Sequence, residues 1–324
     1  MIDYRFNTCS IIENFFKDID PSEFETEEFN LLPFLRVVLA HEVEENHLNL
    51  FRSLSIEKDV YNDLSKNFFK NYKNLEINDY KNISGTENYE LFIGRLRRNY
   101  FSANKRSYSQ EDLVLQLFKN HNILAKKILF KDYDPEFRLQ DLFNDLEVSF
   151  PRSFDFKSIS DFEKYISLFL KLKKKIKKTK FNFYYLLERT LRFILIAKKS
   201  KLIAEKILNI SKPNRVFLNL YGSPEIMGFV HACNLNKIPT VEIPNGMVGA
   251  ATWQYNHMLF SKKYSFSEFP SHIWCWDNNM VEDIKIKNNV NNFERINLGH
   301  PRFILYRPTT RDINDKKIKI LITQ

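Results

Sequence analysis

Cysteine is scarce in this sequence, which contains only Cys9, Cys233 and Cys275. No two of them are spaced as Cys-x-x-Cys, so we expect neither a disulfide framework nor a thiolate metal site. Long apolar runs are also missing, because no window reaches the roughly 18 apolar residues that a membrane-spanning helix requires. Residues 1–20 contain acids and no apolar core, so we expect no secretory signal. These absences predict a reducing, cytoplasmic compartment.

Glycine is rare as well, with 7 residues in 324, whereas the chain has 30 Phe and 15 Tyr. This composition excludes a low-complexity or disordered chain and favours helix-rich, aromatic cores. The length is sufficient for at least one full core and favours two domains. The net charge of +9 favours an anionic partner, which could be nucleic acid, an anionic membrane surface or a phosphorylated ligand.

The apolar pattern divides the chain into two parts. Up to about Leu170 the apolar residues recur mainly at helical spacing, and a long helical run over residues 181–210 ends before Pro213. We therefore predict a helix-rich N-terminal region over residues 1–180. From Arg215 the pattern is strand, helix, strand, which indicates a βαβ unit with a parallel sheet. We predict that a Rossmann-like domain covers residues 181–308.

The last residues contain a polar link around Pro308 and then the apolar run "IKILIT". The link is typical of an interdomain linker. We expect residues 309–324 to be this linker and the first strand of a further domain, and the alternative is an edge strand.

Three loops should meet at the carboxyl edge of the predicted sheet, where ligands bind in open parallel sheets. They are residues 221–225, residues 244–246 and the segment after Asp277. Asn245-Gly246 supports positive φ, and Ser223 is a candidate helix N-cap with Pro224 at the first helical position. The alternative for each loop is ordinary turn and cap chemistry.

An ordered set of motifs follows the predicted βαβ unit. It consists of Lys-Ile-Pro-Thr-Val-Glu-Ile, Pro-Asn-Gly, Met-Val-Gly-Ala, an aromatic stretch with Tyr255, Ile-Trp-Cys-Trp and Leu-Gly-His-Pro-Arg. In this order they resemble the N-terminal half of GT-B glycosyltransferases of bacterial capsule and lipopolysaccharide biosynthesis. The resemblance covers roughly residues 203–324. It depends on the order of the motifs, because each one alone is weakly specific.

The resemblance implies transfer of a sugar from a nucleotide-activated donor to a growing surface glycan or lipid-linked acceptor. It implies no metal and no cofactor, with the nucleotide sugar as co-substrate. The expected second Rossmann-like domain, which would hold most nucleotide-sugar contacts, is truncated, so the chain would supply mainly the acceptor half. The family's Gln-His-Gly turn is here Pro244-Asn245-Gly246, and Asn cannot act as a general base near neutral pH.

Sugar transfer requires a base for the acceptor hydroxyl and positive or amide groups for the leaving phosphate. On the resemblance, the candidate catalytic residues are Glu225 and His257. The candidate substrate-binding residues are Ser223, Asn245, Gly246, Tyr255, His300 and Arg302. The alternative for Glu225 is an acid that complements the helix dipole.

A metal site is not expected on the helix that contains His41, Glu44 and His47. The two histidines are six residues apart and point in different directions, whereas a zinc helix places them four apart. A di-iron bundle would need a second Glu-x-x-His pair, and the sequence has none.

The lysine run at residues 171–180 has Leu172 and Ile176 four residues apart, which predicts a helix with one apolar strip. Such a helix suits an anionic membrane surface, and the alternative is a solvated face. The candidate membrane-surface residues are Lys173, Lys174, Lys177 and Lys178. Nucleic acid is disfavoured, because no recognised binding module accompanies the charge. We expect a cytoplasmic protein that lies peripherally at the inner face of the plasma membrane.

A second function remains open, namely a non-catalytic transferase-like module that binds glycan or a partner subunit. Asn245 in place of the expected His and the end at Gln324 both favour it.

Overall fold

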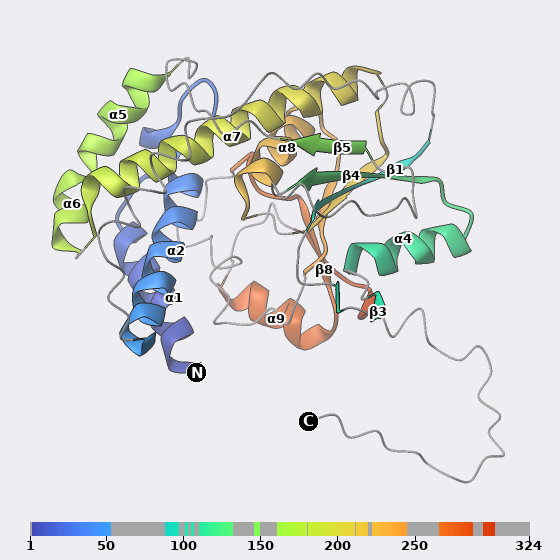
Figure 1. Ribbon diagram of the computed structural model, residues 1–324, viewed down its shortest axis with the longest axis horizontal. Helices are drawn as coiled ribbons and strands as arrows, with labels where there is room; N and C mark the ends of the chain where they lie inside the picture. Colours follow the sequence, from blue (N-terminus) through green and yellow to red (C-terminus); the bar gives the residue numbers. More distant parts are fainter. Residues whose placement is uncertain are drawn as a thin grey trace, which may run out of the picture.

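A computed structural model describes most of the chain (Figure 1). The described residues are 2–52, 88–96, 101–102, 105–106, 110–131, 146–149, 161–179, 181–210, 212–219, 222–244, 266–287 and 294–301. They form an α/β protein in which helices cover a parallel sheet.

The described part of the sheet has seven strands, all parallel, in the order β5-β4-β1-β6-β7-β8-β9. Its strands are β1 (Glu90–Leu96), β4 (Ala125–Lys131), β5 (Leu146–Ser149), β6 (Arg215–Leu218), β7 (Thr240–Glu242), β8 (His272–Cys275) and β9 (Glu294–Asn297). Along the chain, β4 and then β5 are added on one side of β1. The chain then crosses to β6 on the other side of β1, and β7, β8 and β9 follow in order to the opposite edge. This is the doubly wound order of Rossmann-like sheets with one added edge strand.

The other elements are helices and a short hairpin. The helices are α1 (Ile2–Phe16), α2 (Leu31–Arg52), α4 (Gln110–Asn120), α5 (Phe162–Lys171), α6 (Lys173–Lys178), α7 (Phe183–Ile210), α8 (Pro224–Leu235) and α9 (Asn278–Lys287). A 3-10 turn, η1 (Pro21–Phe24), precedes α2, and β2 (Phe101–Ser102) pairs antiparallel with β3 (Lys105–Arg106).

The predicted α/β class and parallel sheet are confirmed, and β6, α8, β7, β8 and α9 lie where the sequence placed them. The prediction of a mainly helical segment up to Leu170 is wrong for β1, β4 and β5. The apolar residues of the segment 109–130 recur at helical spacing, although the segment contains both α4 and most of β4. Asn122, with a φ of 57°, lies in the turn that separates them. Among the described residues, the first strand of the sheet therefore starts at Glu90, and the sheet takes strands from both sides of residue 180. Residues 309–324 lie outside the described part.

Alternating side chains on the strands fill two cores on opposite faces of the sheet. Val216 and Leu218 of β6 belong to the larger core, which also contains residues of α2, α7 and α8. Phe217, between them, belongs to a smaller core with α4 and stacks on Phe92 of β1, with ring centroids 4.9 Å apart. Both faces are apolar, as expected for a parallel sheet covered by helices on each side.

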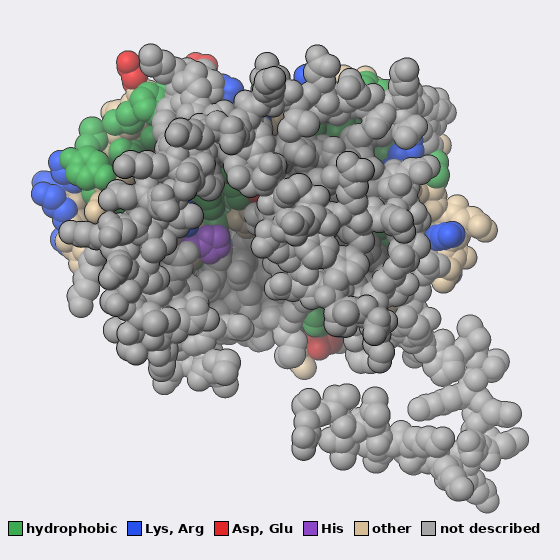
Figure 2. Space-filling model, viewed as in Figure 1, with side chains coloured by type: hydrophobic (Ala, Val, Ile, Leu, Met, Phe, Trp, Pro, Cys, Tyr) green, Lys and Arg blue, Asp and Glu red, His purple; other side chains and the backbone are tan. Residues whose placement is uncertain are grey.

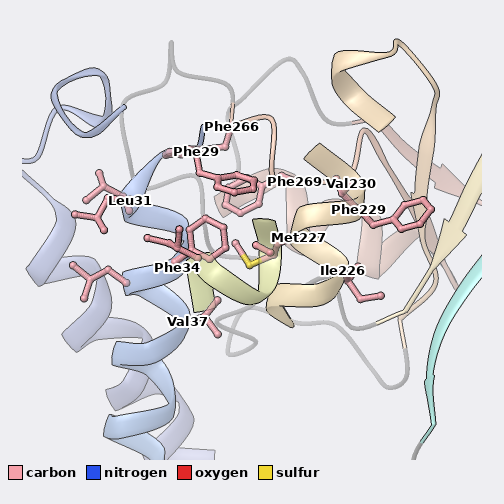
Figure 3. Close-up of a cluster of buried hydrophobic side chains, with 14 of the residues drawn as sticks. Phe29, Leu31, Phe34, Val37, Ile226, Met227, Phe229, Val230, Phe266 and Phe269 are labelled. Carbon is pink, nitrogen blue, oxygen red and sulfur yellow. The ribbon is translucent and has the colours of Figure 1, made fainter. Parts of the chain in front are cut away.

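The larger core joins the N-terminal helices to the sheet. Figure 3 shows Phe29 and Phe34, at the start of α2, facing Phe269 and Met227 of the C-terminal part. All four side chains are buried, and the rings of Phe29 and Phe34 meet edge to face with centroids 5.4 Å apart. The hydrophobic core is thus continuous across the predicted domain boundary at residue 180.

At the amino ends of β1 and β6, where the two halves of the sheet meet, Glu90 lies opposite Arg215. The Arg215 guanidinium donates to Glu90 Oε1 from Nη2 at 2.7 Å and to both carboxylate oxygens from Nε at 3.2 Å. Glu90 is buried and Arg215 is half-exposed. The hydrogen bonds that Arg215 donates to Glu90 raise the pKa of Arg215. The pair links β1 to β6 at the amino edge of the sheet.

Helices α7 and α8 approach each other backbone to backbone at Gly228. A Cβ atom added to Gly228 would lie 2.0 Å from the carbonyl oxygen of Ala197 on α7. A side chain cannot be accommodated there by a rotamer change, because the neighbouring atoms are backbone. Glycine is therefore required at position 228 for α8 to pack this closely against α7.

We expect Gly228→Ala to destabilise the protein by about 1–3 kcal/mol, the usual cost of overpacking a core. Urea unfolding followed by circular dichroism measures this change. Adding Ala197→Gly should not restore stability, because the clash is with backbone atoms of residue 197. Leu235→Ala, an exposed change on α8, is the control and should cost less than about 0.5 kcal/mol. Equal stability of Gly228→Ala and wild type would contradict the close contact.

Candidate functional site

The loop after β6 brings Ser223 and Glu225 to the carboxyl edge of the sheet. Ser223 is the N-cap residue of α8, with φ −86° and ψ 141°, and Pro224 follows it in the first turn, as predicted. Ser223 and Glu225 are both buried, with exposed fractions of 8% and 7%. Strand β6 lies beside β1, so these residues are next to the point where the strand order reverses, the usual ligand position in such sheets.

The Ser223 hydroxyl does not make the bond that an N-cap normally makes. In ordinary capping, the side-chain oxygen accepts a hydrogen bond from the second or third backbone N–H of the helix. Ser223 makes no side-chain cap bond, and its Oγ has no hydrogen-bond partner among the described residues. A buried hydroxyl costs free energy when it lacks a partner. Simple cap chemistry therefore does not account for Ser223, and its hydroxyl is suited to bind a ligand.

Glu225 is held in the first turn of α8 by α7. The Ser200 hydroxyl, itself buried, donates to the Glu225 carbonyl oxygen at 2.5 Å. An acid at this position complements the positive end of the helix dipole, which was the alternative to a catalytic role. The same negative charge disfavours a second anion at the start of α8. The polar groups here, a hydroxyl and a carboxylate, therefore suit a neutral, hydroxyl-bearing ligand better than a phosphate.

Asn219 joins the ends of β6 and β7, a role that the sequence analysis missed. Its side-chain Nδ2 donates to the Ile243 carbonyl at 3.1 Å, and the Ile243 N–H donates to the Leu218 carbonyl at 2.7 Å. Asn219 is buried, with 1% of its surface exposed. The sequence signal that could have identified Asn219 is an asparagine directly after an apolar strand. This bond fixes the point at which the chain leaves the sheet before Pro244.

His300 lies at the carboxyl end of β9, the edge strand. Its ring meets that of Trp276, which follows β8, at a centroid distance of 4.2 Å. The Trp274 indole N–H donates to the Gly299 carbonyl at 2.7 Å, and Gly299 has a φ of 82°, which favours glycine. Since β9 is three strands from β6, and strands lie about 4.8 Å apart, His300 is roughly 14 Å from the Ser223 loop. His300 and Glu225 therefore lie at the same edge of the sheet but are not neighbours.

The remaining predicted site residues lie outside the described part of the structure. They are Asn245, Gly246, Tyr255, His257 and Arg302. The described part breaks off after Pro244, which follows the buried carboxyl end of β7, and again after Pro301, directly before Arg302. The third predicted loop is described, and there Asp277 Oδ1 accepts from the Met280 N–H at 2.7 Å, which is ordinary cap chemistry at the start of α9.

A buried polar cluster on α8 was not predicted. His231 Nδ1 lies 2.8 Å from Ser267 Oγ and 3.8 Å from Glu268 Oε1, and Glu268 Oε1 accepts from the Asn30 N–H at 2.9 Å. A hydrolytic serine–histidine–acid triad needs the serine and the acid on different ring nitrogens. Both lie on Nδ1 here, so the cluster is structural and joins α8 to the start of α2.

Burial controls the protonation of this cluster. Desolvation, followed by the charge of Lys201, lowers the pKa of His231 to about 3. Desolvation, partly opposed by the hydrogen bond from the Asn30 N–H, raises the pKa of Glu268 to about 7. Burial thus favours the uncharged form of each group, and the two are not an ion pair near pH 6.

The raised pKa of Glu268 predicts a pH-dependent stability. Between pH 4.5 and about 7 the folded state binds the proton and the unfolded state does not, so the free energy of unfolding falls as pH rises. His231 has the opposite effect between about pH 3 and its ordinary 6.5. We expect Glu268→Gln to gain stability relative to wild type across pH 4.5 to 7, on the order of 3 kcal/mol.

Urea unfolding at several pH values measures this difference. Glutamine keeps the acceptor for the Asn30 N–H, so the change tests the ionisation of Glu268. Glu27→Gln removes an exposed carboxylate and serves as the control. Parallel curves for Glu268→Gln and wild type would show that Glu268 does not titrate in this range.

The described residues bear on both metal binding and membrane crossing. No group of three His, Cys, Asp or Glu side chains in that part of the chain could hold a metal ion. His41 has a ring contact with Phe193, with centroids 6.4 Å apart, and the side chains of Glu44 and His47 lie outside the described part. Of the helices described, none combines the length and apolarity needed to cross a bilayer.

Comparison of the chain with protein-family models, with curated proteins and with solved structures found no match. The resemblance to GT-B glycosyltransferases therefore depends on the sequence motifs alone. The fold adds a parallel sheet in Rossmann-like order with Ser223 and Glu225 at its carboxyl edge.

Proposed function

We propose that this protein is a GT-B type glycosyltransferase that moves a sugar from a nucleotide-activated donor to a growing bacterial surface glycan. The observation that carries the proposal is the pair formed by Ser223 and Glu225. The two residues are buried together at the start of α8, beside the strand-order reversal of the sheet. A hydroxyl and a carboxylate in such a position match what the acceptor side of a sugar-transfer site needs.

In the proposed reaction Glu225 takes the proton of an acceptor hydroxyl. The acceptor oxygen then forms a bond to the anomeric carbon of the donor sugar, and the nucleotide leaves with the electron pair of the broken carbon–oxygen bond. Ser223 would hold the acceptor by a hydrogen bond. Stabilisation of the leaving phosphate requires positive or amide groups, and Arg302 is the candidate from the sequence.

The substitution Glu225→Gln tests this mechanism. We expect it to lower transfer in the full-length enzyme by about 100-fold or more, because the amide keeps the shape and loses the base. The measurement is release of free nucleotide from a panel of nucleotide sugars in the presence of surface-glycan acceptors. Glu163→Gln, which removes an exposed carboxylate on α5, is the control and should retain full turnover.

Thermal unfolding of the Glu225→Gln variant separates catalysis from folding. An unchanged melting temperature with lost transfer supports the assignment. Unchanged turnover would remove Glu225 from the mechanism.

A second candidate function is a non-catalytic module that binds glycan or a partner subunit. Asn245 favours it, because asparagine stands where the resembling family has histidine and cannot act as a base. Glycan binding by calorimetry, together with no nucleotide release from any donor tested, would favour this function over transfer.

A further inference from the structure

We propose that the corner formed by the end of α5, helix α6 and the start of α7 binds an anionic membrane surface. This inference is independent of the proposed transfer chemistry. Figure 2 shows lysine and arginine side chains gathered over α6 at the edge of the molecule, with hydrophobic side chains beside them over α5. We call this surface the lysine corner, and it consists of Leu170, Lys173, Lys174, Lys177, Lys178 and Tyr184.

The geometry of α6 separates its charged face from its apolar face. Leu172 and Ile176 are buried, with 3% and 0% of their surfaces exposed, and they hold the helix against the core. At 3.6 residues per turn, the four lysines at positions 173, 174, 177 and 178 fall within an arc of roughly 140° on the opposite side. All four are exposed. The helix therefore presents its cations to solvent as one surface.

Within the described part of the chain, no acid neutralises these four lysines. None of them has a carboxylate within ion-pair distance among the described residues, whereas Lys171 pairs with Glu23 at 3.8 Å. Lys173 Nζ lies 5.8 Å from the centroid of the Phe183 ring, which keeps α6 close to the start of α7. Their positive charge is thus available to an anionic partner.

Exposed apolar side chains flank the charge. Leu170, at the end of α5, is 48% exposed, and Tyr184, in the first turn of α7, is 73% exposed. An aromatic ring with a polar tip is the kind of side chain that lies at the level of lipid headgroups. Cations and an amphipathic aromatic side by side match an anionic bilayer surface, which offers both charge and an apolar boundary.

The chemistry of the cations favours a membrane over nucleic acid. The corner contains lysine and no arginine, and lysine is a hydrated point charge that cannot grip a single phosphate with two parallel hydrogen bonds. In the space-filling view it projects at the outer edge of the described part, whereas a bound strand needs a groove (Figure 2). A diffuse field of negative headgroups needs neither feature.

Vesicle flotation with the full chain tests the proposal. We expect binding to phosphatidylcholine vesicles that contain about 30% phosphatidylserine, and little binding to phosphatidylcholine alone, at about 0.15 M salt. The variant K173Q/K174Q/K177Q/K178Q should bind the anionic vesicles more weakly by about fivefold for each lysine, or roughly several hundred-fold. Its melting temperature should match wild type, because all four side chains are exposed.

A matched control removes the same charge elsewhere. K119Q/K206Q/K212Q/K237Q changes four exposed lysines on α4, at the far end of α7 and at the amino edge of the sheet. It should bind like wild type. Tyr184→Ser should weaken vesicle binding by a factor that stays constant as the salt concentration is raised. The factor lost in K173Q/K174Q/K177Q/K178Q should instead shrink, because salt screens the lysine charges.

Three results would overturn the proposal. The first is equal binding of the wild type to neutral and anionic vesicles. The second is an equal loss in the control and the α6 variant, which would show that net charge alone acts. The third is binding of an RNA oligonucleotide through these four lysines without binding to vesicles, which would assign the corner to nucleic acid.

Discussion

The close contact between α7 and α8 at Gly228 is the constraint on which the rest of this structure depends. Helix α8 lies on the sheet, and its first turn forms the candidate site. Helix α7, with 28 residues and a length of about 42 Å, packs against α8 and also against α2, α5 and α6. Because the two backbones meet directly, the Ser200 hydroxyl reaches the Glu225 carbonyl. One helix thus connects the candidate site to the N-terminal helices.

Buried hydrogen bonds between segments that are distant in sequence fix the elements around the candidate site. Asn219 ties the end of β6 to β7, and Asn30 ties the start of α2 to Glu268. Each polar group lies in an apolar core, where loss of its partner would cost the full desolvation penalty. These bonds fix β6 against β7 and the start of α2 against the segment before β8, and the Ser200–Glu225 bond fixes the first turn of α8. The seven-stranded sheet therefore serves as a rigid support for Ser223 and Glu225.

The sequence predicts the C-terminal half of the fold better than the N-terminal half, and the reason is physical. Strand β6 (RVFL) and the run IPTVEI that contains β7 are short, rich in apolar and β-branched residues and bounded by turn residues, so local pattern suffices to find them. Strand β1 begins with Glu90, and the partner of its carboxylate is Arg215, 125 positions further along the chain. The spacing of apolar residues within a short window cannot reveal such a partner. The positions of Ser223 and Glu225 at the start of α8 follow from the local Ser-Pro signal for a helix start. The role of Asn219 depends instead on its hydrogen bond to the neighbouring strand. The separation of His300 from Glu225 depends on strand order, which spacing along the chain does not give.

The two proposed surfaces carry opposite charge and lie at different places along α7. Tyr184 and Ser200 are separated by about 24 Å along the helix axis, so the lysine corner is well removed from Glu225. At the start of α8 the carboxylate disfavours phosphate, and at the lysine corner the cations favour it. If the acceptor is linked to a lipid phosphate, its anionic part would be attracted to the corner while a neutral sugar hydroxyl extends to Glu225. Charge separation of this kind would orient a long acceptor without requiring either surface to recognise all of it.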